Sequence, residues 1–128
     1  MLITELLNNN AQTYRDAIAL VEREPQYNKR RVLTWQEFED QSNRVAWGLR
    51  ARGVKKGDRA AILMTNCLEW LPLYFGILKS GALAVPLNFR FDADTILKIR
   101  QTIAAEPAVA TVTSVTGRNA GRFRFVEA

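Results

Sequence analysis

The 128-residue chain contains no histidine and a single cysteine, Cys67. Without an imidazole there is no Ser–His or Cys–His pair to activate a nucleophile, and no metal site can be built on histidine. One thiol can form neither an internal disulfide nor a multi-cysteine zinc site. The sequence therefore offers no residue set that we predict to be catalytic or metal-binding.

Two further absences concern the membrane. The chain has no apolar run of 18 or more residues, so no transmembrane helix is predicted. Its first residues lack both the basic region and the long apolar segment of a secretory signal, and the expected compartment is the cytoplasm. With 48% apolar and 24% charged residues, the composition is typical of one soluble globular domain.

The net charge of +5 could indicate a nucleic-acid partner. Much of the excess lies near the C-terminus, at Arg118, Arg122 and Arg124, and the only aromatic residues among them are Phe123 and Phe125. A basic surface without a stacking platform favours a solvated chain end over a nucleic-acid site. We therefore expect no nucleic-acid partner.

Helix and strand signals are clear in the first half of the chain. Apolar spacing predicts a helix over 2–12, and two short strands, 17–23 and 31–34, are typical of a hairpin. The segment Thr34-Trp-Gln-Glu37 is a capping box, so a helix is expected to begin there. Gly53 should end it, because glycine adopts the left-handed conformation at low cost.

The second half alternates strands and helices. Apolar segments at 59–64, 82–87 and 108–113 are typical of strands buried on both faces of a parallel sheet. Asn66-Cys-Leu-Glu69 and Asp92 predict the starts of the two intervening helices. Pro72 conflicts with the first of these helices, which must either begin irregularly or kink.

This order predicts an α/β fold, a mostly parallel sheet with helices on both faces. We expect one α/β subdomain over 1–113 and a divergent basic tail over 114–128, with a short strand near 123–126.

Four blocks carry a family resemblance. Leu33-Thr-Trp-Gln-Glu-Phe38, Gly53-Val-Lys-Lys-Gly-Asp-Arg59, Asn66-Cys-Leu-Glu-Trp70 and Ile77-Leu-Lys-Ser-Gly-Ala-Leu-Ala-Val-Pro-Leu-Asn88 occur in the order and spacing of the adenylate-forming (AMP-binding) superfamily. Asn88-Phe-Arg90 resembles the acyl-CoA synthetase, or fatty-acid–CoA ligase, branch. The similarity covers residues 2 to about 100 and implies the first subdomain of that fold.

The resemblance also implies a reaction. Members convert a fatty or aromatic carboxylic acid and ATP, with Mg, to an acyl-adenylate and then form a thioester with CoA. Their phosphate loop, ribose-binding carboxylate and distal lysine lie beyond the matching segment. The chain alone is therefore expected to be inactive, as the N-terminal part of such a ligase that a complementing chain could complete. The alternative is a non-enzymatic remnant or partner-binding module.

Individual candidates have plain structural alternatives. Arg90 could contact a CoA phosphate, or form a salt bridge with Asp92 or Asp94. Lys55 and Lys56 are favoured as solvated charges, and Cys67 as a packed thiol rather than a reactive one. The segment 113–121 lacks the close of a phosphate loop and is favoured as a surface turn. The aromatic residues are favoured as core over a ligand site: Trp35, Trp47, Trp70, Tyr74 and Phe75.

Overall fold

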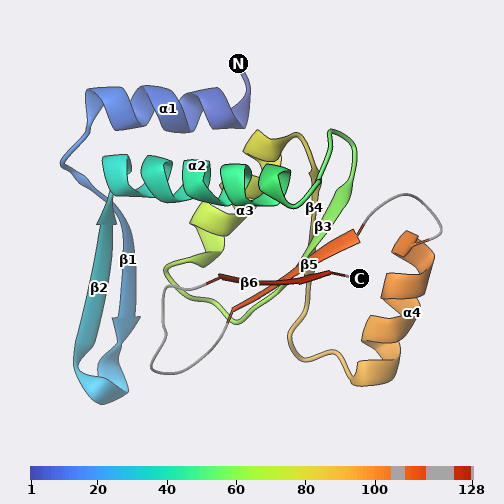
Figure 1. Ribbon diagram of the computed structural model, residues 1–128. Helices are drawn as coiled ribbons and strands as arrows, with labels where there is room; N and C mark the ends of the chain where they lie inside the picture. Colours follow the sequence, from blue (N-terminus) through green and yellow to red (C-terminus); the bar gives the residue numbers. More distant parts are fainter. Residues whose placement is uncertain (105–108, 115–122, 128) are drawn as a thin grey trace.

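The computed structural model describes residues 1–104, 109–114 and 123–127 (Figure 1). Its elements are α1 (Ile3–Thr13), β1 (Ile18–Glu24), a 3₁₀ turn (Pro25–Tyr27), β2 (Lys29–Thr34), α2 (Trp35–Ala51), β3 (Arg59–Leu63), α3 (Trp70–Ser80), β4 (Leu83–Leu87), α4 (Ala93–Ala104), β5 (Val109–Ser114) and β6 (Phe123–Glu127). In this described part, no helix is long and apolar enough to cross a membrane.

The main sheet has the strand order β4-β3-β5-β6. β3 pairs in parallel with both β4 and β5, and β6 pairs antiparallel with β5. α4 lies beside β5, on the side of the sheet away from α2 and α3 (Figure 1). The predicted α/β fold, with a mostly parallel sheet and helices on both faces, is confirmed.

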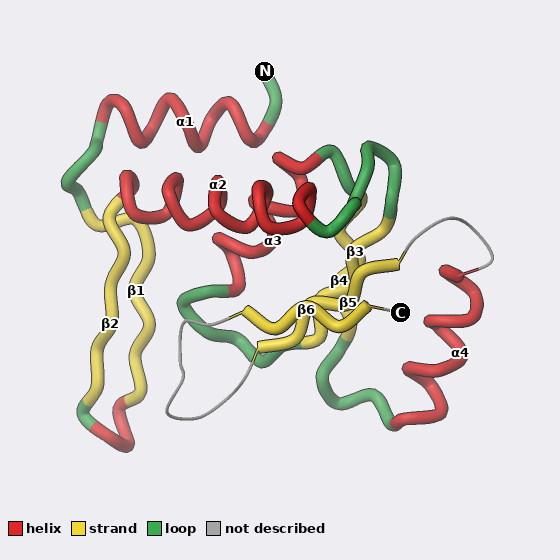
Figure 2. Tube along the Cα trace, viewed as in Figure 1, coloured by secondary structure: helices red, strands yellow, loops and turns green. Residues whose placement is uncertain are grey.

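The first two strands stand apart from this sheet. β1 and β2 form an antiparallel hairpin of their own, as Figure 2 shows. Asn28 takes the left-handed conformation at its turn, with φ of 50°. Two backbone hydrogen bonds, from Trp35 N–H to the Ala17 carbonyl and from Gln36 N–H to the Arg15 carbonyl, join it to the start of α2. The hairpin is confirmed, and β2 does not enter the parallel sheet.

The core forms where α2 and α3 pack on β3. The capping box is confirmed: Glu37 N–H donates to Thr34 Oγ1 at 3.2 Å, and Thr34 N–H donates to the Glu37 carboxylate at 2.8 Å. Gly76 of α3 lies against Val45 of α2 so closely that any side chain there would collide with it. The fully buried members of the core are Leu49, Ala60, Ile62, Leu73 and Ile77.

The start of α3 corrects one prediction. The helix begins at Trp70, not at the Asn66 capping pattern, and no side chain caps it. Pro72 therefore lies in the first helical turn, where its missing N–H has no intrahelical acceptor and its ring meets no helical carbonyl. Of the two alternatives for Pro72, the irregular start is supported, because the helix begins later than the capping pattern predicts. Gly81 ends α3 with φ of 87°.

A second correction concerns β4, which is an edge strand and not a fully buried one. Leu83 is 53% exposed. Leu83 N–H donates to the Asp58 carbonyl beside β3, so by alternation the backbone of Ala84 and Pro86 faces the free edge. Proline lacks an N–H, and its presence on the free edge disfavours pairing with another strand.

Candidate functional site

The candidate site lies where β3 and β4 end. Leu63 of β3 is in register with Leu87 of β4, so the loops 64–69 and 88–92 emerge at one edge of the sheet. The chain leaves β3 toward α3 and leaves β4 toward α4, on opposite faces. Ligands of open α/β sheets bind at such a switch point, outside the carboxyl ends of the strands.

Arg90 lies in the second of these loops. Asn88 fixes the local backbone, because its Oδ1 accepts the Arg90 N–H at 2.9 Å and its carbonyl accepts the Phe91 N–H at 3.0 Å. The Arg90 guanidinium lies over the Phe89 ring, with Cζ 5.7 Å from the ring centroid. Both side chains are exposed, so the guanidinium is a cation accessible at the surface.

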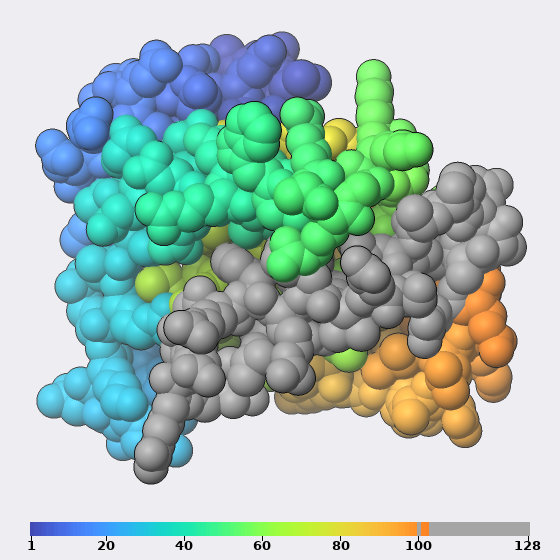
Figure 3. Space-filling view, in the orientation of Figure 1, coloured from blue at the N-terminus to red at the C-terminus, as the bar shows by residue number. Residues whose placement is uncertain are grey.

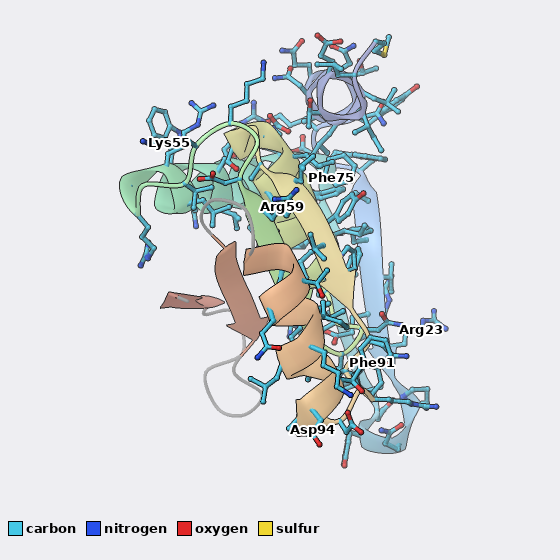
Figure 4. The ribbon with its side chains drawn as sticks, turned by 90° about the vertical axis from the view of Figure 1, so that its right-hand side faces the viewer. Arg23, Lys55, Arg59, Phe75, Phe91 and Asp94 are labelled. Carbon is cyan, nitrogen blue, oxygen red and sulfur yellow. The ribbon has the colours of Figure 1, made fainter. Side chains whose placement is uncertain are left out.

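The two nearby carboxylates do not hold Arg90. Asp92 caps α4 instead, and its Oδ1 accepts the Thr95 N–H at 2.7 Å. Hydrogen bonding by Thr95 lowers the pKa of Asp92 below its ordinary value. Asp94 is exposed in the first turn of α4 (Figure 4). Within residues 1–104 no ion pair joins Arg90 to either carboxylate, so the salt-bridge alternative is wrong.

Ion pairs join the loop after β3 to the β1–β2 hairpin. Arg31 of β2 forms ion pairs with Glu69 before α3 and, at 3.4 Å, with Glu22 of β1. Burial acts to lower the pKa of Arg31, but the hydrogen bond and negative charge of Glu69 outweigh it, and the pKa is raised. This cluster fixes the loop that presents Asn66 and Cys67.

Cys67 lies in this loop as a half-buried thiol. Burial raises its pKa to about 11, with the charge of Glu69 adding to the effect. A thiol that stays protonated at neutral pH is a poor nucleophile. The geometry supports the packed thiol over the reactive one.

The turn before β3 uses its polar residues to fold. Asp58 Oδ2 accepts the Lys55 N–H at 2.7 Å, and Gly57, with φ of 89°, donates its N–H to the Gly81 carbonyl at 3.0 Å. The side chains of Lys55 and Lys56 are exposed, and Figure 4 shows Lys55 pointing away from the body. They are solvated charges, as predicted.

The aromatic residues divide into two groups. Trp70 stacks on Tyr74 with centroids 5.4 Å apart, and Phe75 meets Phe38 edge to face at 5.2 Å. These contacts confirm a packing role. The prediction that Trp47 belongs to the core is wrong, because its side chain is 71% exposed. It lies on the outer face of α2, beside the buried stripe of Val45, Ala46 and Leu49.

With this geometry in place, comparison with known proteins decides the family. A family model described as AMP-binding enzyme matches residues 7–121. The chain belongs to the AMP-binding enzymes.

The relatives of this AMP-binding chain include several acyl-CoA ligases. It is 35% identical over 89 residues to a crotonobetaine/carnitine–CoA ligase of Proteus mirabilis, covering 70% of this chain and 17% of that protein. It is 42% identical over 64 residues to the long-chain-fatty-acid–CoA ligase FadD13 of Mycobacterium tuberculosis, covering 50% and 13%.

A solved structure agrees with the sequence relatives. The inhibitor-bound N-terminal domain of FACL13 from Mycobacterium tuberculosis matches with a TM-score of 0.66 and 37% identity, over 76% of this chain and 23% of that one. This chain therefore corresponds to the N-terminal portion of acyl-CoA ligases, and it spans about a sixth of the length of the first of these relatives.

The structure describes only part of two features of this AMP-binding chain, the segment 113–121 and the carboxylate and thiol groups that could hold a metal ion. The segment 113–121 begins in β5, and its residues 115–121 lie outside the described part of the chain. Within the part that is described, no three carboxylate or thiol groups come together to hold a metal ion.

Sequence reasoning missed one buried polar cluster in this AMP-binding chain. Lys79 Nζ of α3 contacts Glu39 Oε1 at 2.5 Å and Asn43 Oδ1 at 2.8 Å, both on α2. Glu39 is 6% exposed, and its Oε2 is buried without a hydrogen-bond partner. Glu39 and Asn43 are four residues apart and so share a helix face. This spacing was the only feature of the sequence that pointed to the cluster.

Proposed function

We propose that this chain is the N-terminal portion of an ATP-dependent acyl-CoA synthetase, and that alone it builds a fold and does not catalyse. One observation supports this most directly. Several polar groups of the shared sequence blocks are engaged in folding: Thr34 and Glu37 cap α2, Asp58 closes a turn, and Glu69 pairs with Arg31. These side chains already have partners within the fold, so few of them are free to bind a nucleotide.

The reaction of the full-length enzyme has two steps. A carboxylate attacks the α-phosphorus of ATP, giving an acyl-adenylate and pyrophosphate, and the CoA thiol then displaces AMP to form the thioester. Such catalysis depends on positioning and on stabilising phosphoryl oxygens. ATP, magnesium and CoA are the cofactors and co-substrates of this proposal, and the chain alone is expected to need none.

Arg90 is the residue of this chain that we place against CoA. Its guanidinium is exposed, unpaired with Asp92 or Asp94, and held over Phe89 at the switch-point edge of the sheet. A guanidinium recognises phosphate with two parallel hydrogen bonds. A CoA phosphate is therefore the partner assigned to it.

The substrate is a carboxylic acid, fatty or aromatic, and a cytoplasmic location belongs to the same proposal. The catalytic parts must come from the remaining portion of the ligase, and a complementing chain could supply them. The side of the molecule around β4 fits such contact, because apolar side chains there are 40–53% exposed: Leu83, Phe89, Phe91 and Leu97.

A chimaera tests the proposal. The matching segment of the Proteus crotonobetaine/carnitine–CoA ligase is replaced by residues 2–100 of this chain, and thioester formation is measured. We expect activity to be retained. Arg90→Ala in the chimaera should raise the KM for CoA about tenfold, the cost of one charge-assisted hydrogen bond, and leave the KM for ATP unchanged. Lys98→Ala, an exposed cation on α4, is the matched control.

The outcomes separate the two parts of the proposal. A folded chimaera without activity would argue for the alternative, a non-enzymatic remnant or partner-binding module. An active chimaera in which Arg90→Ala and Lys98→Ala behave alike would keep the ligase assignment and overturn the role of Arg90.

A further inference from the structure

The groove between α1 and α2 has no role in the function proposed above. It has a volume of about 690 Å³ and is lined by residues of α1, α2 and α3. Figure 3 shows α1, in blue, lying against α2, in teal, on this side of the molecule. Its apolar lining comes from Leu2 at the start of α1, from Ala46 and Trp47 on α2, and from Leu78 on α3. A groove of this size can accept a large side chain from another molecule.

Exposed apolar side chains gather along this groove. Trp47 is 71% exposed and Leu2 is 66% exposed, and both line it. Leu6, one helical turn beyond Leu2, is also about half exposed. Single exposed apolar residues are ordinary, but a contiguous group with a tryptophan marks an interaction surface, because tryptophan is enriched among the residues that dominate binding energy.

The charges of the groove are balanced. Glu5 and Glu39 contribute two carboxylates, and Arg50 and Lys79 contribute two cations. Glu39 and Lys79 pair with each other at the floor, while Glu5 and Arg50 are exposed on opposite walls. A surface with equal charge of both signs does not select a nucleic acid or an anionic lipid.

The geometry points to a second copy of this chain as the occupant. A two-fold interface needs a patch that is complementary to itself. This groove holds both a projecting side chain, Trp47, and the hollow that can receive one. A two-fold axis beside Trp47 inserts each tryptophan into the partner's groove and brings Glu5 of each copy to Arg50 of the other.

Sedimentation equilibrium of the full chain tests this dimer. We expect a monomer–dimer equilibrium, and Trp47→Ser should weaken association by on the order of tenfold or more. Tyr14→Ser, at an exposed aromatic beyond the end of α1, is the matched control and should leave association unchanged. Circular dichroism checks that each variant is folded.

A charge exchange distinguishes this interface from any other. Glu5→Lys and Arg50→Glu should each abolish the homodimer, because each places like charges opposite one another. An equimolar mixture of the two folded variants should dimerise, because both new pairs are then complementary. Arg44→Glu, on α2 outside the groove, should behave as the wild type.

Three results would overturn the inference. The first is a wild-type chain that remains monomeric at concentrations on the order of 1 mM. The second is association that Trp47→Ser leaves unchanged. The third is a charge-exchanged mixture that stays monomeric.

Discussion

The two sides of the main sheet are built differently. On the α2–α3 side, helices interlock closely enough to require glycine at 76, and buried polar groups such as Ser42 and Ser80 donate to backbone carbonyls. On the β4–α4 side, Leu83, Phe89, Phe91 and Leu97 are exposed, and Arg90 has no carboxylate partner among the described residues.

Under the function proposed above, this difference separates the part of the chain that stabilises the fold from the part that would contact CoA and the rest of the ligase. Several polar groups of the family's sequence blocks, among them Thr34, Glu37, Lys79 and Ser80, lie on the closed side and help to hold it together. The open side carries the accessible Arg90 cation and the apolar surface, which are the features that a ligand or a partner requires. Substitutions should therefore destabilise the closed side strongly and the open side weakly.

Gly76→Ala should give the largest loss of stability. An added Cβ would lie 2.5 Å from Val45 Cγ1 and 2.8 Å from the Ser42 carbonyl oxygen, so α2 and α3 would have to move apart. We expect a loss of about 3 kcal/mol in the free energy of unfolding, measured with urea, despite the better helix propensity of alanine.

Gly53→Ala is the control for that substitution. Gly53 has φ of 87°, and a Cβ added there would have nothing within 4 Å, so its replacement tests backbone strain alone. It should cost about 1 kcal/mol. Equal losses at the two glycines would show that helix contact is not what requires Gly76.

Lys79→Ala should give the second-largest loss of stability. It leaves the Glu39 carboxylate buried without its cation, although Asn43 Nδ2 still donates to it at 3.3 Å. Removing one partner of a buried ion pair is costly, and we expect a loss of about 2 kcal/mol. Glu39→Gln combined with Lys79→Met should recover part of that loss. A single variant as stable as the wild type would contradict the role given to this pair.

Cys67 should make a smaller, pH-dependent contribution to the free energy of unfolding. Its pKa in the folded chain, about 11, lies above the ordinary value of 9.0. The thiol's contribution to stability is therefore present below pH 9 and is lost as the pH rises from about 9 to about 11. Reaction of the thiol with a disulfide reagent should be slow at pH 8 and accelerate toward pH 11. In Cys67→Ser, the pH dependence of the free energy of unfolding between pH 9 and pH 11 should disappear. Rapid, complete labelling at pH 8 would contradict the burial of this thiol.

Leu83→Ser and Leu97→Ser should have the smallest effects. Both side chains are about half exposed on the open side, and each replacement should change the free energy of unfolding by less than about 0.5 kcal/mol. In the active chimaera the same replacements should lower the stability of the whole enzyme by more. Equal effects in both settings would show that nothing packs on this side.

The features that the sequence could predict are local. The Thr34 capping box, the Asp92 cap and the glycines at 53 and 81 depend on residues within a few positions of each other. The order of strands and helices depends on apolar periodicity, which is local as well. The family resemblance extended these local signals to the correct fold.

The features that could not be predicted depend on packing between distant elements. Lys79 meets Glu39, 40 residues away, only because α3 crosses α2 at Gly76. Trp47 is an exception, because helix periodicity alone places it outside the buried stripe of Val45, Ala46 and Leu49. Its exposure could have been predicted, and only its apolar character favoured the core. The edge position of β4 had one local signal, Pro86, because proline within a sheet is confined to edge strands, first positions and bulges. Which strand pairs with β4 on its other side is set by topology and could not be predicted from the segment itself.

Pyrophosphate exchange is the most direct test of the central claim. The purified 128-residue chain is incubated with ATP, magnesium, labelled pyrophosphate and a panel of fatty and aromatic acids. The expected result is no exchange above background for the chain alone, and clear exchange for the chimaera under the same conditions. Robust exchange by the chain alone would contradict the claim that it folds as part of a ligase without forming the adenylating site.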